Sequence, residues 1–241
     1  MSISDIILDL LFPQKPFCIS CNALLRSGES LICSNCAAKL TPITPPHCTK
    51  CGKPLGEGMS SADHPPKICS DCREADHRFI QARSYGQYEG VLKQLIFEFK
   101  YRRRPEIAGF LGKKMTETLE NLQWPSFDYI VPVPLHRERL GERGYNQALL
   151  LAKVVSKNTG IPISCCLVRK KATEHQTLLD KRLRRQNLEE AFNADLRADL
   201  SGKRILLLDD VYTTGSTADA CTNALIYAGA KEIYVLTCAR G

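Results

Sequence analysis

The sequence predicts an α/β protein with a mostly parallel sheet and helices on both faces, preceded by a small cysteine-rich domain. Strand-like apolar runs alternate with amphipathic helical segments in the longer, C-terminal part of the 241 residues, and this alternation is typical of a parallel sheet covered by helices. The N-terminal part instead holds four C-x-x-C pairs, many prolines and short polar turns. The composition changes between Arg73 and Phe79. We therefore expect two domains, at residues 1–77 and 78–241.

Hydrophobic periodicity places the elements of the second domain. Apolar residues recur three and four positions apart in helical segments and form short continuous runs in buried strands. In chain order we expect helices at 89–101 and 106–122, a strand at 127–134, a helix at 144–160, strands at 162–169 and 204–210, a helix at 215–230 and a strand at 231–239. The run at 204–210 is apolar on both faces, which favours a strand that is covered on both sides.

Composition and charge limit the kind of protein. Hydrophobic residues make up 44% and charged residues 24% of the chain, as in soluble globular proteins. The formal net charge of +7 permits an anionic partner without requiring one. No apolar run approaches the roughly 20 residues that span a bilayer. Because Asp5 and Asp9 interrupt its start, the chain is expected to begin with an amphipathic helix rather than an export signal, and no membrane association is expected.

The paired cysteines predict two structural zinc sites. Two-residue spacing lets one tight turn present two thiolates to a tetrahedral Zn²⁺, and a closed structural site takes four. Metal binding would also supply folding free energy to a segment with few large apolar residues. We therefore predict a double zinc ribbon with two Zn²⁺ ions in a reducing compartment, the cytoplasm. The eight ligands are Cys18, Cys21, Cys33, Cys36, Cys48, Cys51, Cys69 and Cys72.

Alternatives remain for these motifs. Either two consecutive C-x-x-C pairs bind the same zinc ion, or the pairs interleave, so that each ion is bound by pairs that are not consecutive. A redox-active C-x-x-C site is the functional rival of a zinc ribbon, although such a site usually lies at a helix start beside a strand. The other cysteines are expected to be small buried side chains, and the nearby histidines to be surface residues: Cys165, Cys166, Cys221 and Cys238, and His47, His64 and His77.

A polar turn follows the apolar strand at 204–210. It is expected at the carboxyl end of that strand, where open α/β sheets bind ligands, and at the start of a helix, whose free amides and dipole favour an anion. A glycine allows close backbone approach, and hydroxyl groups add donors. No Gly-Lys-Ser/Thr follows, so the turn is not a Walker A loop. These features predict a phosphate-binding turn made of Thr213, Thr214, Gly215, Ser216 and Thr217.

Two adjacent carboxylates, Asp209 and Asp210, precede this turn. Carboxylates would repel a phosphate, but they accept hydrogen bonds from vicinal hydroxyl groups. A phosphate beside a diol predicts a ribose 5-phosphate ligand. The alternative is a capped strand–turn–helix with two solvated acids.

The stretch Ile205–Thr217, with the sequence ILLLDDVYTTGST, resembles the phosphoribosyl pyrophosphate (PRPP) motif of type I phosphoribosyltransferases. The resemblance implies a type I phosphoribosyltransferase fold for residues 78–241, with PRPP bound together with Mg²⁺. It also implies that Asp209 and Asp210 contact the ribose hydroxyls and that the turn holds the 5-phosphate.

Two basic segments agree with this resemblance. The segment 131–147 continues a predicted strand into a turn, and the resemblance implies that Leu135, His136 and Arg137 hold pyrophosphate there. The basic residues between 169 and 185 correspond to the mobile lid of the related enzymes, which would exclude water around the reacting centre. A basic surface turn and a solvated basic helix are the respective alternatives.

The chain as a whole is similar to the ComF family of competence proteins. The similarity rests on the cysteine pairs, on the segments 85–101, 131–147 and 176–187, and on the PRPP motif. It implies a role in natural transformation, in which the protein handles single-stranded DNA in the cytoplasm with a helicase partner. The run KYRRRP at 100–105, with Tyr101 among cations, would contact DNA phosphates and stack on bases.

Two functions remain open. In the first, the chain is an active phosphoribosyltransferase with Asp209 and Asp210 as catalytic residues; a nitrogen acceptor attacks C1 of Mg·PRPP while pyrophosphate leaves, although the sequence offers no obvious base for the acceptor. In the second, the chain is a non-catalytic adaptor whose binding of nucleic acid is regulated by PRPP. Both functions require PRPP to bind, so turnover is what separates them.

Overall fold

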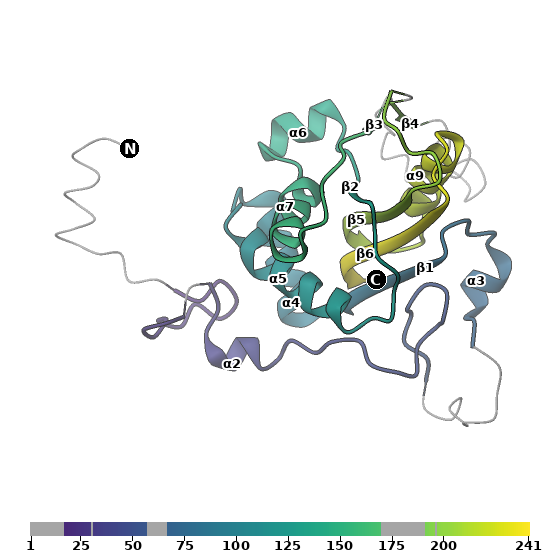
Figure 1. Ribbon diagram of the computed structural model, residues 1–241. Coiled ribbons are helices and arrows are strands. Elements are labelled where there is room, and N and C mark those ends of the chain that lie inside the picture. The colour runs from purple at the N-terminus through teal and green to yellow at the C-terminus, as the bar shows by residue number, and fades with distance from the viewer. Residues whose placement is uncertain (1–16, 30, 57–66, 170–190, 196) are drawn as a thin grey trace, which may run out of the picture. The chain divides into compact units, whose positions relative to one another are not determined.

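The computed structural model divides into two compact units, Met1–Thr41 and Pro42–Gly241 (Figure 1). The second pair of C-x-x-C motifs therefore belongs to the same unit as the sheet. The domain boundary near residue 77, drawn from composition, stays a prediction. The structure describes residues 17–29, 31–56, 67–169, 191–195 and 197–241. The helix expected at the start of the chain and nearly all of the basic lid segment lie outside these residues.

A four-stranded parallel sheet, in the order β1-β6-β5-β2, forms the centre of the described part of the larger unit. Its strands are β1 Gln81–Gln87, β2 Tyr129–Pro132, β5 Arg204–Tyr212 and β6 Glu232–Arg240. The apolar runs of β5 and β6 are buried in the middle of the sheet, as continuous apolar runs predict. Pro132, the last residue of β2, pairs with Leu208 in the middle of β5, so the chain that follows β2 leaves the sheet beside Asp209.

Helices cover both faces of the sheet (Figure 1). On one face α5 and α7 pack on the strands and α4 packs on α5, whereas α9 packs on β5 and β6 from the other face. The bounds are α4 Gly90–Tyr101, α5 Ile107–Glu120, α7 Gln147–Thr159 and α9 Ser216–Tyr227. α7 ends where Gly160 adopts a left-handed φ of +76°, as expected for a glycine after a helix. The predicted fold class is confirmed: a parallel sheet with helices on both faces follows the cysteine-rich ribbons in the chain.

Short elements complete the described part of the chain: α2 Ser34–Ala37, α3 Ser70–Glu74, α6 Arg137–Arg143, β3 Leu167–Arg169 and β4 Phe192–Ala194. The strand predicted at 162–169 was too long, because within it only β3 pairs as a strand, antiparallel to β4, and Ile163 makes an isolated bridge to Ile130. Cys165 is exposed as a result, contrary to expectation, while the other three unpaired cysteines are buried as predicted. None of the described helices has the length and apolarity needed to span a bilayer.

The segment that leads into the second cysteine cluster covers the outer edge of β1. Ile43 N donates to Tyr85 O at 2.7 Å, and Ala82 N donates to Lys50 O at 2.7 Å. These bonds occupy backbone groups that an edge strand otherwise leaves open. The segment that contains Ile43 and Lys50 is therefore hydrogen-bonded to the sheet along this edge.

Candidate phosphate-binding cleft and metal centres

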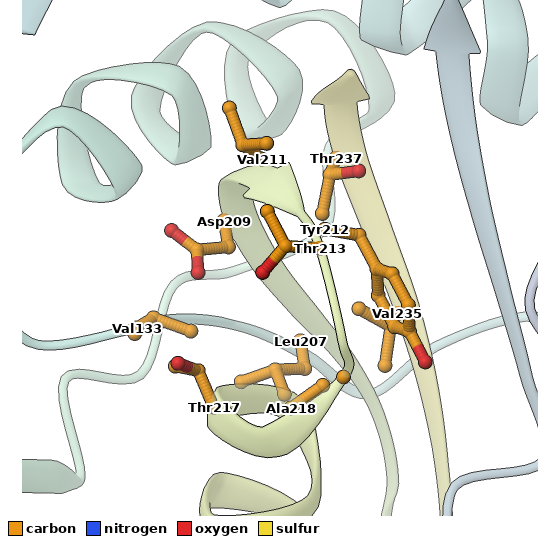
Figure 2. Close-up of a pocket in the computed structure, with 11 residues that line it drawn as sticks. Val133, Leu207, Asp209, Val211, Tyr212, Thr213, Thr217, Ala218, Val235 and Thr237 are labelled. Carbon is orange, nitrogen blue, oxygen red and sulfur yellow. The ribbon is translucent and has the colours of Figure 1, made fainter. Parts of the chain in front are cut away.

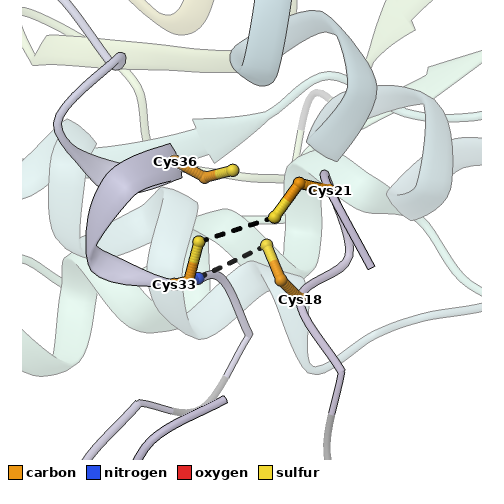
Figure 3. Close-up of side chains that lie close together, drawn as sticks. All are labelled: Cys18, Cys21, Cys33 and Cys36. Atoms are coloured by element: carbon orange, nitrogen blue, oxygen red, sulfur yellow. Dashed lines mark hydrogen bonds between the residues drawn. The ribbon is translucent and has the colours of Figure 1, made fainter. Parts of the chain in front are cut away.

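The eight paired cysteines form two four-thiol clusters, and in each the four Sγ atoms lie within 4.8 Å of one another. Figure 3 shows the side chains of the first cluster converging on one point. A Zn–S distance of about 2.3 Å in a tetrahedron separates the sulfurs by roughly 3.8 Å; Cys21 and Cys33 are 3.6 Å apart, and Cys51 and Cys69 are 3.7 Å apart. The thiols therefore fit two structural zinc sites. The pairing is consecutive, as Cys18, Cys21, Cys33 and Cys36, and as Cys48, Cys51, Cys69 and Cys72.

Both clusters have the same local geometry. The residue after the second cysteine is left-handed in each, with φ of +56° at Asn22 and +71° at Gly52. The backbone N–H of the third cysteine donates to the first sulfur at 3.3 Å in each. Desolvation opposes ionisation of Cys18, but the surrounding backbone N–H donors outweigh it and lower the pKa of this thiol to about 6. Such donors favour the thiolate that zinc requires.

A small cleft lies at the carboxyl end of β5. Asp209 from β5, Thr213 from the turn and Thr217 from α9 line it, and Val133 contributes from the residue after β2. Figure 2 shows the Asp209 carboxylate and the Thr217 hydroxyl group on the same side of the turn, away from the Tyr212 ring. The structure thus brings the acidic strand end and the polar turn together around one cleft.

The turn 213–217 offers backbone amides to this cleft. The first helical hydrogen bond of α9 runs from Asp219 N to Gly215 O at 2.8 Å, so the amides of Thr217 and Ala218 precede the first helical donor and have no acceptor within the helix. Both residues line the cleft. Amides at this position, with the helix dipole behind them, attract an anion.

Close packing fixes the middle of the turn. Gly215 has a φ of +86°, and a Cβ there would overlap the Tyr212 hydroxyl group and lie 3.1 Å from Cε1 of His77. Thr214 Oγ1 and Ser216 Oγ are 2.9 Å apart across the turn. Glycine is therefore required at position 215 both for its conformation and for the space it leaves.

The two adjacent carboxylates point to opposite faces of the sheet, because successive side chains alternate along a strand. Asp209 faces the cleft on the α9 side. Asp210 is buried on the other face of the sheet, where α4, α5 and α7 lie, and its Oδ1 is 2.7 Å from Lys100 Nζ. The two acids therefore occupy different environments, although the sequence predicts a shared role.

The environment of Asp209 disfavours its charged form. Burial, and then the neighbouring charge of Asp210, raises the pKa of Asp209 to about 7, although Lys100 and Arg169 partly offset the rise. Near neutral pH the carboxyl group therefore exists in both protonation states. It can accept hydrogen bonds in one state and donate one in the other.

The predicted pyrophosphate turn begins beside the cleft. Val133 N donates to the backbone of β5 at 2.9 Å, and Val133 lines the cleft. Leu135 and His136 are half-buried and Arg137 is exposed. His136 caps α6 by accepting a hydrogen bond from Glu138 N at 3.4 Å. The three predicted residues thus come shortly after Val133 in the chain. Among the described residues that line the cleft, none of the three is found.

The histidines near the ribbons differ from expectation. His77, expected on the surface, is 7% exposed, and its Nδ1 lies 2.9 Å from Asp219 Oδ1. Its ring stacks on Phe79 with 4.8 Å between centroids. The expectation was wrong because the residue directly precedes the apolar start of the sheet and is covered by α9. His47 is half-buried, and His64 lies outside the described residues.

Arg240 is a buried cation that sequence reasoning missed. It is 6% exposed at the end of β6, and its Nη1 donates to Thr213 O at 2.6 Å. Its guanidinium carbon lies 4.7 Å from the centroid of the Tyr212 ring. A single arginine near the end of an apolar strand carries no distinctive pattern, so this contact could not be predicted.

The parallel sheet, the cleft and the four-thiol clusters define a zinc-ribbon protein with a candidate ligand site in its α/β part. Residues 7–73 match the family described as a double zinc ribbon domain. The sequence is 32% identical to competence protein F of Haemophilus influenzae over 229 residues, which are 92% of this chain and 96% of that protein. It is 33% identical to the DNA utilization protein YhgH of Escherichia coli over 90% of this chain and 94% of that protein. The chain belongs to the competence protein F (ComF) family.

A solved structure shows a partial likeness. The glutamine PRPP amidotransferase from Bacillus subtilis, complexed with ADP and GMP, matches 58% of this chain and 30% of its own. The sequence identity is 22% and the TM-score is 0.40.

Proposed function

We propose that the cleft binds the ribose 5-phosphate part of PRPP together with Mg²⁺, and that the protein uses this ligand in handling single-stranded DNA in the cytoplasm. The observation that carries the first part is that Asp209 lines one cleft with Thr217 and Ala218, whose amides precede the first helical donor of α9. The amides suit the 5-phosphate, and the carboxylate suits the ribose hydroxyls. The names of two relatives, competence protein F and DNA utilization protein, support the second part.

Cations around the cleft support an anionic ligand. Arg169 lies near enough to Asp209 to offset part of its raised pKa, and Lys100 does so from the opposite face of the sheet, where it pairs with Asp210. Burial, and then the charge of Arg139, lowers the pKa of Arg169, so these two arginines are neighbours. We propose that they and the turn at 135–137 hold the pyrophosphate group. Mg²⁺ would neutralise charge on the phosphate oxygens, as it does when substrate phosphates supply its ligands.

The two acids have separate proposed roles. Asp209 contacts the ribose directly, whereas Asp210 acts through Lys100, which it holds at 2.7 Å. In an active transferase, this chain would contribute by positioning the ribose and by stabilising the charge of the departing pyrophosphate. Asp209 would also be a candidate base for the acceptor, because burial raises its pKa to about 7, near the optimum for proton transfer.

Calorimetric titration tests the ligand. Mg·PRPP and ribose 5-phosphate are expected to bind the wild type, and Asp209→Asn is expected to weaken binding about tenfold or more, since a hydrogen bond to a charged group contributes about 1.5–3 kcal/mol. Asp128→Asn is the matched control. Asp128 accepts a hydrogen bond from Arg204 N at 2.8 Å, at the opposite end of the sheet. Equal affinities for wild type and Asp209→Asn, or no binding by the wild type, would sink the proposal.

Pyrophosphate release separates the enzyme from the adaptor. Wild type and Asp209→Asn are incubated with Mg·PRPP and a small-molecule extract that serves as the acceptor pool. Release by the wild type alone identifies a transferase and allows the acceptor to be fractionated. Background release by both, with PRPP bound, favours the non-catalytic adaptor.

A basic aromatic surface near the end of α4 supports DNA binding. Phe97 and Tyr101 are 44% and 59% exposed, with 5.1 Å between their ring centroids. The Arg143 guanidinium lies 5.1 Å from the Tyr101 ring, and Arg102 and Arg103 are exposed beside it. Bases stack on such rings, and cations contact the phosphates.

Fluorescence anisotropy with a labelled oligothymidylate tests this surface. Tyr101→Ala is expected to weaken binding about tenfold, because stacking contributes about 1–3 kcal/mol per base. Tyr227→Ala is the control, since Tyr227 is 87% exposed on α9. Unchanged affinity in Tyr101→Ala, or an equal loss in both variants, would remove this surface from the proposal.

A further inference from the structure

We propose that the second cysteine cluster, with zinc bound, fixes the shape of the phosphate-binding turn through Arg240, so that ligand binding in the cleft depends on zinc in this cluster. The ligand in this inference is that of the proposed function. The coupling itself rests on contacts within one compact unit, Pro42–Gly241. The first cluster lies in the separate unit Met1–Thr41 and provides an internal comparison.

The Arg240 side chain spans the cluster and the turn. Its Nη2 donates to Cys51 Sγ at 3.9 Å. Its Nη1 donates to Thr213 O at 2.6 Å and lies 3.4 Å from Tyr212 O. One buried guanidinium therefore contacts both a zinc ligand and the first residue of the turn.

Tyr212 adds a packing contact between Arg240 and the centre of the turn. The Tyr212 ring, 4% exposed, lies against the Arg240 guanidinium. Its hydroxyl group has no hydrogen-bond partner among the described residues and abuts Gly215, where a Cβ would overlap it. Because interiors are close-packed, a shift of Arg240 displaces the ring and, with it, Gly215.

Zinc matters because it fixes one end of this contact. A zinc-bound sulfur is a thiolate held at one corner of a tetrahedron, and a guanidinium donates a charge-assisted hydrogen bond to such an anion. Without the ion, the loop that carries Cys51 loses its fixed geometry, since folding of such loops depends on the metal. Arg240 then keeps its hydrogen bonds to the carbonyl oxygens of Tyr212 and Thr213, but it loses the fixed sulfur atom that holds its other end.

The cysteine loop also packs against the sheet beside this contact. Lys50 Nζ donates to Phe79 O at 2.5 Å, and the Phe79 ring lies edge-on to the Tyr212 ring with 6.1 Å between centroids. The loop before Cys51 is thus held against Phe79, whose ring packs on the Tyr212 ring that supports the turn. A change in the cluster therefore reaches Tyr212 by two routes.

The first test replaces the arginine and leaves both clusters intact. Arg240→Leu is expected to retain two zinc ions per chain and the helical circular dichroism of the wild type, and to bind ribose 5-phosphate about tenfold more weakly, as expected when a charge-assisted hydrogen bond is lost. Arg204→Leu is the matched control, because Arg204 pairs with Glu232 at the opposite end of the same strands. Wild-type affinity in Arg240→Leu would overturn the inference.

The second test compares the clusters. Cys21 and Cys72 are the more accessible thiols of their clusters, so Cys21→Ser and Cys72→Ser form a matched pair. Each is expected to lose one zinc ion, but Cys72→Ser alone is expected to weaken binding of ribose 5-phosphate. Equal losses, or a loss only in Cys21→Ser, would contradict the inference. If Cys72→Ser does not fold, Arg240→Leu still decides.

Hydrogen exchange separates this inference from the ligand assignment. In the absence of ligand, Arg240→Leu is expected to speed amide exchange in the turn 213–217 but not at the amino end of β5. If the wild type binds neither ribose 5-phosphate nor PRPP, the proposed function fails, and exchange still measures the coupling. Unchanged exchange in the turn of Arg240→Leu would overturn it.

Discussion

Strand alternation separates two adjacent carboxylates in this protein. Asp209 lines the cleft, whereas Asp210 and Lys100 form a 2.7 Å ion pair with side chains 10% and 17% exposed. A partly open acid beside a cleft and a buried, paired acid respond differently to neutralisation. Ligand binding should depend most on the first and stability on the second.

Asp210→Asn is expected to destabilise the protein by about 3 kcal/mol, because removing one partner of a buried ion pair leaves the other charge uncompensated. Urea unfolding followed by circular dichroism measures the change. The double variant Lys100→Met/Asp210→Asn should recover most of the loss, since it removes the stranded cation. A single variant as stable as the wild type would show that the pair is solvated rather than buried.

The raised pKa of Asp209 predicts a pH dependence of stability. Its folded pKa is about 7, against a usual value of 3.8, so the folded protein holds this proton more tightly than the unfolded chain does. The contribution of Asp209 to stability therefore falls as pH rises between these two values and levels off above the folded pKa. Asp209→Asn lacks this group, so its stability relative to the wild type should increase from pH 4 to pH 7 and then stay constant. A relative stability independent of pH in urea titrations would contradict the raised pKa.

Buried polar residues set the limit of prediction at this scale. The motif residues 209–217 could be placed at a cleft because their residue types alone suggest an anion site. His77 and Arg240 could not, because their burial depends on partners 142 residues away in one case and 189 residues away in the other. A polar residue's partner is set by the tertiary fold, and a single sequence does not show it.

At the scale of elements, α5 and α7 approach each other over a glycine. A Cβ on Gly112 would lie 2.6 Å from Val154 Cβ. This close approach brings the two helices together on the face of the sheet that also holds Lys100.

Gly112→Ala is therefore expected to destabilise the protein by about 1–3 kcal/mol through overpacking, although alanine is the better helix former. Gly109→Ala on the same helix is the control. It meets nothing within 4 Å and should stabilise by about 0.5–1 kcal/mol. Adding Val154→Ala to Gly112→Ala should restore part of the loss. Urea midpoints measure all four proteins, and a stabilised Gly112→Ala would show that the helices separate freely.

Hydrophobic pattern explains which elements could be predicted. The helices α4, α5, α7 and α9 and the strands β5 and β6 show strong periodicity or long apolar runs, and the structure confirms them. β1 was missed because its sequence, QARSYGQ, is mostly polar; it is a strand because it pairs with β6 and because Ser84 Oγ meets Thr237 Oγ1 at 2.7 Å. α6 was missed because its charged sequence has no apolar face.

At the scale of the whole molecule, the two clusters have different surroundings. The first stands in the small unit, whereas Cys48, Cys51 and Cys69 are packed in the hydrophobic core that also holds Phe79 and Cys221. Zinc in the second cluster should therefore contribute to the stability of the whole α/β unit.

The purified protein is expected to contain two zinc ions per chain by elemental analysis. A strong chelator should lower the thermal midpoint of the helical signal, because metal binding contributes free energy to folding. The helices beyond residue 77 dominate that signal, so it reports on the larger unit. A helical midpoint that is unchanged after both ions are removed would show that the second cluster is independent of the sheet.

The bonds of Ile43 and Lys50 along β1 have a consequence for solubility. An uncovered strand edge is a template for pairing with another chain, and the chain that covers this edge is the one that the second cluster holds in place. Loss of the metal should therefore uncover the backbone groups at the edge of β1 while most of the fold persists. Zinc-depleted protein would then assemble edge to edge, and light scattering would rise before helical content falls.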